Sequence, residues 1–440
     1  MMRVLFIDAA DPVSKLNQRF APLWPAYLAA HLETRIGSNR FEFRLSNGRV
    51  ENELKSFKPH VVAISSVTMN YNHAMEYARI VKKTGLPVVI GGIHISFMPH
   101  SLTKEMDVGC IGEGEETFAE LMRLYLDSGE FNHNNLATIN GVIYRNDGKL
   151  ISTPRRPLIA SIDHISHPKR ALLGFRNTDT MMTARGCPYR CVFCSVSRYW
   201  KKVRFASPDF VIDEITELVK NGVRIIKIYD DLFTCNQKRL EQIAERIQSS
   251  GLYRRVKFAC WCRANTVTQE VTDALKKMNV VSVELGLESG CDRILRYLKG
   301  NVSLNENYKA IELLKNAGIQ TNAAFIIGSP DETEDEIMQT YDFIKKSRLD
   351  TVTVNPLIPF PGTPIWEYAS DKGLVSEDME WGQIGRIVIS EKLSAAQLHR
   401  ILKKFKRLCL IKRLRALPKS PWLQEAPKIG WKRLITKFLR

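Results

Sequence analysis

The sequence predicts an α/β protein in which a doubly wound parallel sheet precedes a partial barrel and a basic helical tail. Three observations predict this order. Apolar runs of strand length alternate with helical patterns over residues 1–134. The alternation resumes over residues 179–365, where polar or glycine-rich residues follow the strands. Near the start of this second region, the run CPYRCVFC places three cysteines within eight residues.

The region 1–134 is expected to form a Rossmann-like domain. Its strand-like runs lie at residues 4–7, 61–65, 88–90 and 108–111, with helical patterns such as 73–84 between them. Such alternation implies a ligand site beyond the carboxyl ends of parallel strands. Small or polar residues stand at those ends: Asp8, Ser65, Ser66, Thr68, Gly91, Gly92, His94, Gly112, Glu113 and Gly114. Paired glycines let a bulky ligand approach the backbone closely.

Residues 135–178 are expected to connect the two regions. The turn signal Asn146-Asp147-Gly148 separates two short apolar runs and predicts a small hairpin. Prolines at positions 154, 157 and 168 then lead to the barrel.

The region 179–365 predicts a partial (β/α)6 barrel of the TIM type. Six strands are expected, at residues 181–185, 224–229, 256–261, 281–287, 320–327 and 351–357. Polar groups concentrate where these strands end, which is the face that carries the site in such barrels. The run Pro330-Asp331-Glu332-Thr333 is interpreted as a helix N-terminus with acidic residues in its first turn.

The cysteines Cys187, Cys191 and Cys194 have the spacing C-x3-C-x2-C. Three thiolates are one fewer than a closed zinc site or an all-cysteine iron–sulfur cluster uses. A four-iron cluster held by three cysteines keeps one iron open for chemistry. Structural zinc is the alternative, but no further His or Cys follows until Cys235.

With this motif, residues 180–357 resemble the radical S-adenosylmethionine (SAM) enzymes. The resemblance implies that the three cysteines hold a 4Fe–4S cluster and that SAM binds its open iron. Reduction by a donor such as flavodoxin or ferredoxin then yields a 5′-deoxyadenosyl radical, which abstracts hydrogen. The residues expected to contact SAM are Phe193, Asp230, Asp231, Arg263 and Glu288. For the four charged residues, a strand-end cap or an internal ion pair remains the alternative.

The amino-terminal region resembles the cobalamin-binding domain that precedes the barrel in one radical SAM class. The matching features are the serine-rich end of the second strand segment, the GGIH turn and the GEGE loop. The loop from Asp8 to Leu23 contains no histidine, so the D-x-H-x-x-G signature that supplies a cobalt ligand is missing. The alternative is the same fold without cobalamin, acting as a cap on the substrate side.

The carboxyl-terminal region, residues 366–440, is helical and basic. Residues 401–440 carry +12 of the net charge of +17. An apolar stripe recurs with helical period near the end, at Trp431, Leu434, Ile435, Phe438 and Leu439, beside a cationic face. This pattern predicts a helix lying on an anionic membrane surface. Docking on the barrel is the alternative, and nucleic-acid binding is disfavoured because no RNA-binding module is present.

The upstream amphipathic segment 395–414 is expected to close the barrel. The chain's start shows no secretory signal, and no apolar run reaches the roughly 18 residues that span a membrane. A cytoplasmic location is therefore expected, with peripheral membrane contact through the tail.

Together these features predict a radical SAM enzyme that takes hydrogen from an unactivated carbon, followed by cobalamin-dependent methylation. If the tail binds membrane, a lipid, isoprenoid or tetrapyrrole substrate is favoured over a soluble metabolite. Two alternatives stay open: cobalamin-free cyclisation, coupling or rearrangement, and a non-catalytic cobalamin- or membrane-binding sensor. A tRNA methylthiotransferase is disfavoured because Cys110 stands alone in the first region. No general acid or base is identified.

Overall fold

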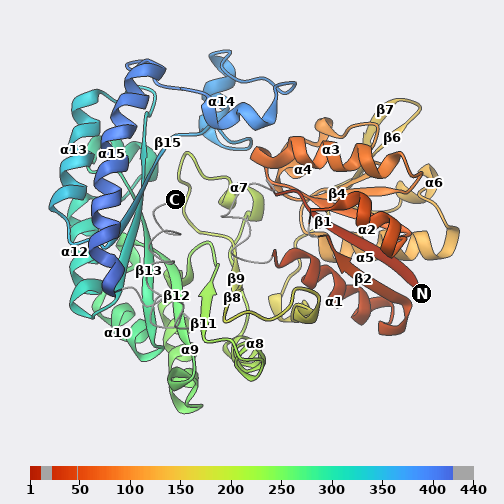
Figure 1. The fold of residues 1–440 in the computed structure, drawn as a ribbon, viewed down its shortest axis with the longest axis horizontal. Helices are drawn as coiled ribbons and strands as arrows, with labels where there is room; N and C mark the ends of the chain where they lie inside the picture. Colours follow the sequence, from red (N-terminus) through yellow and green to blue (C-terminus); the bar gives the residue numbers. More distant parts are fainter. Residues whose placement is uncertain (11–21, 47, 420–440) are drawn as a thin grey trace. The chain divides into compact units, whose positions relative to one another are not determined.

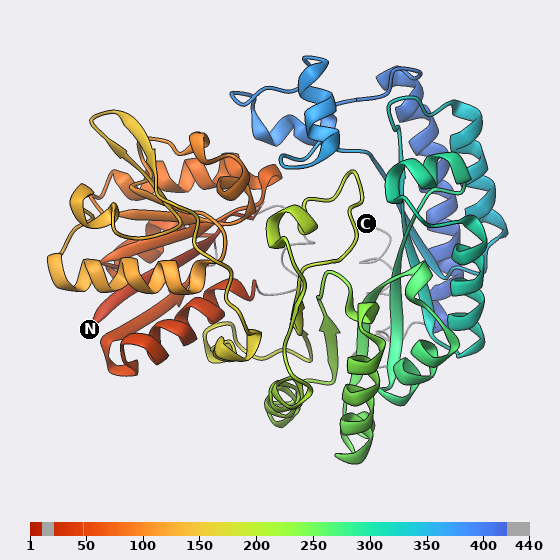
Figure 2. The ribbon, with the colours of Figure 1, turned by 180° about the vertical axis from the view of Figure 1, so that it is seen from behind.

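A computed structural model describes residues 1–10, 22–46 and 48–419 (Figures 1 and 2). The expected terminal amphipathic helix and most of the loop after the first strand lie outside these residues. The chain divides into two compact units, which are described separately. The first comprises Met1–Gly222 and Ile358–Ile389, and the second comprises Val223–Leu357 and the residues from Ser390 onward.

The first unit contains a seven-stranded sheet in the order β2-β1-β3-β4-β5-β6-β7. Its strands are β1 (Met2–Asp8), β2 (Phe41–Leu45), β3 (Val61–Ser65), β4 (Val88–Gly91), β5 (Val108–Cys110), β6 (Val142–Asn146) and β7 (Lys149–Ser152). The first five are parallel, and β6 and β7 are antiparallel. The order 2-1-3-4-5 belongs to doubly wound folds whose ligands bind beyond the carboxyl ends of the strands.

Helices cover both faces of this sheet (Figure 1). They are α1 (Trp24–Ile36), α2 (Val50–Phe57), α3 (Tyr71–Lys82), α4 (Ile93–Phe97), α5 (Gly114–Ser128) and α6 (His133–Leu136). Helices α1 and α5 pack against each other over one hydrophobic core. The strands contribute Val4, Phe6 and Ala63 to this core. Helices α2 and α3 pack together elsewhere on the unit, in contact with β1, β3 and β4.

Two features of this sheet differ from the sequence-based expectation. Strand β2 was not expected, although its Phe-Glu-Phe-Arg-Leu run alternates apolar and charged residues as a half-buried edge strand does. The hairpin expected within a connector extends the sheet instead, since Ile143 of β6 pairs with Gly109 of β5. The sheet therefore continues beyond residue 134.

The first unit also contains the cysteine segment. Its remaining strands and helices are β8 (Thr178–Met181), β9 (Ala184–Arg185), α7 (Val196–Trp200), β10 (Arg204–Phe205), α8 (Pro208–Lys220) and α14 (Pro364–Asp371). The single strand expected over 181–185 is split, because β9 turns to pair antiparallel with β10. Ser207 caps α8 as expected, its hydroxyl accepting from the backbone N–H of Phe210.

The second unit contains five parallel strands that follow one another in chain order. They are β11 (Ile225–Ile228), β12 (Lys257–Arg263), β13 (Val280–Glu288), β14 (Gln320–Ile327) and β15 (Thr351–Pro356). All five were expected, with bounds that differ by at most two residues. Parallel strands joined by helices are the expected barrel arrangement.

The helices of the second unit are α9 (Gln237–Ser249), α10 (Gln269–Lys277), α11 (Asp292–Lys299), α12 (Leu304–Asn316), α13 (Glu334–Lys346) and α15 (Ala395–Ala416). Helix α15 packs against β15 through a buried stripe that includes Leu398, Ile401 and Phe405, as its amphipathic pattern predicts. Among the described helices, none combines the length and the apolar character that crossing a bilayer requires.

Gly290, between β13 and α11, permits close packing against α13. A Cβ atom there would lie 2.6 Å from Phe343 Cβ and 2.7 Å from Thr340 Cα. We expect Gly290→Ala to destabilise the protein by about 3 kcal/mol in urea unfolding, because backbone and core must shift. Gly385→Ala is the control, since its Cβ would meet nothing nearer than 3.5 Å. Equal unfolding midpoints for the two variants would contradict this packing.

Candidate cofactor site

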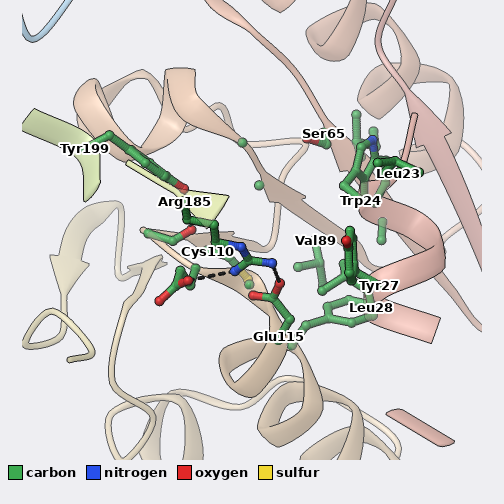
Figure 3. Close-up of a pocket in the computed structure, with 18 of the residues that line it drawn as sticks. Leu23, Trp24, Tyr27, Leu28, Ser65, Val89, Cys110, Glu115, Arg185 and Tyr199 are labelled. Carbon is green, nitrogen blue, oxygen red and sulfur yellow. Dashed lines mark hydrogen bonds and ion pairs between the residues drawn. The ribbon is translucent and has the colours of Figure 1, made fainter. Parts of the chain in front are cut away.

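A cavity of about 220 Å³ opens at the carboxyl edge of the sheet in the first unit (Figure 3). Helix α1 lines it with Trp24, Tyr27 and Leu28, and α5 contributes Phe118. The edges of β3, β4 and β5 supply Ser65, Val89, Gly91, Gly92, Cys110 and Gly112. The walls are thus mostly apolar and aromatic, with glycine backbone at one edge. Such a cavity suits a flat aromatic group.

The cavity also has a wall from the cysteine segment. Met182, Arg185, Tyr199 and Trp200 line it, although they lie far along the chain from the sheet. Sequence reasoning did not identify any of these residues. Three of them are large and aromatic or apolar, and the fourth, Arg185, faces the GEGE loop (Figure 3).

A buried ion-pair network joins this wall to the GEGE loop. Arg185 Nη1 donates to Glu113 Oε1 at 2.7 Å, and its Nη2 donates to Glu115 Oε1 at 2.5 Å. Arg204 Nη1 donates to Glu113 Oε2 at 2.8 Å. All four side chains are at most 9% exposed. Burial alone would raise the pKa of Glu115, but Arg185 holds it below its ordinary value, so the carboxylate stays ionised.

Hydrogen bonds connect the two glycine turns of the sheet edge to Tyr199. The Tyr199 hydroxyl donates to the Gly112 carbonyl at 2.7 Å. The Gly112 N–H donates to Ser96 Oγ at 3.0 Å, and Ser96 Oγ donates to the Gly92 carbonyl at 2.8 Å. Ser96 follows the GGIH turn by two residues and carried no signal of its own in the sequence.

The three cysteines lie on one half-buried loop between β9 and α7. Helix α7 steadies this loop, because Arg198 Nη1 donates to the Cys194 carbonyl at 2.9 Å. Gly186 precedes the loop with φ 100°, and a Cβ there would lie 2.7 Å from the Lys202 carbonyl oxygen. Within the described residues, no three His, Cys, Asp or Glu side chains are grouped so as to ligate one metal ion.

In the second unit, the four charged candidates lie at or just after the carboxyl ends of three adjacent strands. Asp230 and Asp231 follow β11, Arg263 ends β12 and Glu288 ends β13. Arg263 Nη2 donates to the Lys299 carbonyl at 2.9 Å, and Lys299 Nζ lies 3.5 Å from Glu288 Oε1. Arg263 and Glu288 therefore belong to an internal network, with Lys299 as a member that sequence reasoning missed.

Comparison with known families matches both halves of this arrangement. The model of the Radical SAM superfamily matches residues 181–344, and that of the B12 binding domain matches residues 11–122. An uncharacterized methyltransferase of Pyrococcus horikoshii is 33% identical over 80% of this chain and 78% of its own length. The chain belongs to the radical SAM superfamily. Within it, the B12-binding domain places the chain in the cobalamin-dependent methyltransferase class.

Other relatives of this radical SAM protein have names that mention tetrapyrroles. The anaerobic magnesium-protoporphyrin IX monomethyl ester cyclase of Cereibacter sphaeroides is 26% identical over 96% of the chain and 72% of its own length. The bacteriochlorophyllide d C-12(1)-methyltransferase of Chlorobaculum tepidum is 27% identical over 71% of the chain and 66% of its own length.

A solved structure shows the same fold. The radical SAM methyltransferase TsrM of Kitasatospora setae, with cobalamin and a 4Fe–4S cluster bound, superposes with a TM-score of 0.69 at 19% identity. The match covers 85% of this chain and 76% of TsrM. The predicted fold class and the predicted cofactors of the class, a 4Fe–4S cluster, SAM and cobalamin, are confirmed at the level of the family.

The residues present fit these cofactors. Three thiols on one loop suit a cluster in which each cysteine ligates a different iron and one iron stays open, so the three need not be grouped around a single ion. The apolar cavity is too small for a corrin ring and suits an aromatic base such as the one cobalamin carries on its nucleotide tail. Gly112, with φ 89°, lines the cavity where an added Cβ would meet no atom within 4 Å.

The predicted cobalamin residues divide into two groups. Ser65, Gly91, Gly92, Gly112, Glu113 and Gly114 line the cavity. Ser66, Thr68 and His94 are buried outside that lining. His94 packs between Tyr71 and Trp381, with ring centroids 3.9 and 4.5 Å away, and burial lowers its pKa to about 3. Its imidazole is therefore neutral near neutral pH. The roles of the individual residues toward cofactors stay predictions.

A smaller polar cavity of about 100 Å³ lies on β11–β14 in the second unit. Lys227, Ser282, Glu284 and Asn322 are among its lining residues. Burial raises the pKa of Glu284 to about 7, although Lys227 acts in the opposite direction. A carboxyl group that titrates near neutral pH is suited to proton transfer. The alternating pattern of β13 gave no reason to single out Glu284 in the sequence.

The helix N-terminus expected at Pro330–Thr333 is confirmed. Thr333 caps α13 in a reciprocal capping box with Glu336. Glu332, at 0% exposure, accepts the backbone N–H groups of Gly328 and Ser329 at 2.7 and 3.0 Å. Burial raises its pKa to about 7, although these two bonds act in the opposite direction.

The raised pKa of Glu332 predicts a pH-dependent stability. The folded carboxyl keeps its proton between about pH 4.5 and 7, where the unfolded one has lost it, so stability falls as pH rises through this window. We expect wild type to lose about 2 to 3 kcal/mol relative to Glu332→Gln between pH 5 and 8 in urea unfolding. Glu306→Gln, an exposed capping residue, is the control. If the free energy of unfolding changed with pH in the same way for wild type and Glu332→Gln, the raised pKa of Glu332 would be contradicted.

Proposed function

We propose that this enzyme transfers a methyl group to an unactivated carbon of a tetrapyrrole. The observation that carries the proposal is the shared cavity of the first unit, which is lined both by the B12-type sheet with its helices and by the residues on either side of the three cysteines. Its lining joins Trp24 and Phe118 to Tyr199 and Trp200. This arrangement supports joint use of a cluster and a corrinoid by one chain.

The cofactors supply the radical and the methyl group when they are bound, and the protein binds and orients them. Cys187, Cys191 and Cys194 would hold the cluster, and Arg198 orients their loop through the Cys194 carbonyl. Trp24, Tyr27 and Phe118 give the cavity of the first unit an apolar, aromatic lining that suits the flat base of the nucleotide tail.

Several groups in the second unit support an aromatic, acid-bearing substrate. Tyr229 and Trp261, each 40% exposed, lie beside Lys227 at the polar cavity. Aromatic faces suit stacking on a macrocycle, and a lysine suits a propionate carboxylate. Glu284 lines the same cavity, and with its pKa raised to about 7 by burial it would exchange a proton with a substrate bound there. The names of the Cereibacter and Chlorobaculum relatives support the same substrate class.

Ring closure without methyl transfer is the second candidate. It is favoured by the cyclase relative, whose similarity extends over 96% of this chain. The two reactions share the cluster, SAM and the substrate class. They differ in whether the product gains a carbon.

The test is anaerobic expression with cobalamin supplied, followed by assay of SAM cleavage and of products from magnesium-protoporphyrin IX monomethyl ester and bacteriochlorophyllide d. We expect about one corrin per chain, and label from methyl-deuterated SAM in the product. Cys191→Ala should abolish SAM cleavage, whereas Cys409→Ala on α15 should retain it. Loss of hydrogen without label gain would favour cyclisation, and no corrin uptake would contradict methyl transfer.

Peripheral membrane association stays a prediction, because the tail lies outside the described residues. Deletion of residues 431–440 removes four cationic residues and the apolar stripe. We expect the truncated protein to lose sedimentation with anionic vesicles, because each basic residue contributes about 1 kcal/mol at such a surface. Unchanged sedimentation would remove support for a lipid-surface site.

A further inference from the structure

Helix α7 touches both proposed cofactor sites of the first unit with consecutive residues. Arg198 holds the carbonyl of Cys194, Tyr199 holds the carbonyl of Gly112, and Trp200 lines the cavity. The helix is a single short turn, Val196–Trp200, that begins two residues after the third cysteine. The cavity wall and the cysteine loop are therefore joined by a single helical turn.

The ion-pair network gives a second connection with the same end points. Arg185 precedes Gly186 and Cys187 in the chain, and its guanidinium is divided between Glu113 and Glu115. Glu113 itself lines the cavity. The Trp200 ring lies 5.5 Å from the Arg185 guanidinium and 5.3 Å from that of Arg204, so the network and α7 are packed together.

These contacts are too costly to break independently. A buried charge that loses its partner costs several kcal/mol, so Glu113, Glu115, Arg185 and Arg204 move together or not at all. Burial also raises the pKa of Tyr199 to about 12, so its hydroxyl stays protonated and donates to Gly112. Gly186 adds a steric limit, because the backbone here passes close to Lys202.

We propose that Tyr199 and Arg185 are positioning residues that couple occupancy of the cavity to the conformation of the cysteine loop. Binding in the cavity fixes the position of the Gly112–Glu115 loop, and the Tyr199 hydrogen bond and the Arg185 ion pairs connect that position to the loop of Cys187, Cys191 and Cys194. The coupling restricts radical formation to protein whose methyl carrier is in place. This inference rests on the proposed assignment of cobalamin to the cavity and of the cluster to the cysteines.

Coupling between two sites is reciprocal, which gives two readouts that need no substrate. Cobalamin should change the electron paramagnetic resonance spectrum of the reduced cluster in wild type. The cluster should in turn change the dissociation constant for cobalamin by about fivefold or more, measured by visible absorption on cluster-loaded and iron-chelated protein. Iron and corrin contents are measured for every sample, so each response refers to loaded protein.

Tyr199→Phe removes only the hydroxyl that donates to Gly112, and Arg185→Lys keeps the charge while losing the two-pronged contact. We expect both variants to reduce the change that cobalamin causes in the spectrum of the reduced cluster. We also expect the dissociation constants for cobalamin of cluster-loaded and iron-chelated protein to become nearly equal. The matched control is Tyr71→Phe, since the Tyr71 hydroxyl also donates to a backbone carbonyl, that of Ser101, at 2.7 Å, away from the cavity. It should keep the wild-type response.

Three outcomes would overturn the inference. A wild-type cluster spectrum unaffected by cobalamin would show that the sites are independent. A response that both variants retain in full would show that cobalamin acts on the cluster directly rather than through these residues. Failure of wild type to take up cobalamin would overturn the site assignment itself, which separates that failure from a failure of coupling. If one variant takes up no corrin, the other decides the question.

Discussion

The first unit depends on one constraint, which is that four charged side chains are buried together. Glu113 and Glu115 come from the edge of the parallel sheet, whereas Arg185 and Arg204 come from two short strands far along the chain. Each carboxylate is tolerable in the interior only because a guanidinium contacts it. The requirement fixes the position of β9 and β10, and through β9 it fixes where the cysteine loop begins. The cavity, the helix α7 and the loop geometry all follow from that placement.

Local pattern was sufficient to predict most of the fold. The parallel strands are apolar runs bounded by glycine or polar residues, and the helices carry their own caps, so period and turn chemistry identify them without tertiary information. The extension of the sheet by β6 was missed because it depends on a pairing partner, whereas β2 was missed although its alternating pattern is itself a strand signal. Alternation in β2 reflects an exposed edge, and the hairpin joins the sheet through Gly109, whose missing side chain leaves room for Ile143.

The cysteine triplet was predictable because the spacing of its residues indicates the cluster that they bind. Residues whose pKa or hydrogen bonds depend on burial among distant parts of the chain were not predictable. His94, for example, is packed between two aromatic rings, and burial lowers its pKa to about 3, so its imidazole is neutral near neutral pH. The pKa of Glu284 and the ion pair of Lys299 depend on neighbours from other strands and helices. The hydrogen bond of Tyr199 depends on a carbonyl 87 residues away. Sequence pattern reports none of these environments.

The ion pairs join the parallel sheet to the cysteine segment, so the amino-terminal domain and the rest of the chain cannot be separated without breaking them. A fragment that begins near residue 179 would expose Arg185 and Arg204 without counter-ions, and a fragment that ends near residue 134 would leave two acids inside an open cleft. Transplanting a different corrinoid-binding domain onto this barrel therefore requires the arginine pair and the GEGE acids to be exchanged as one set.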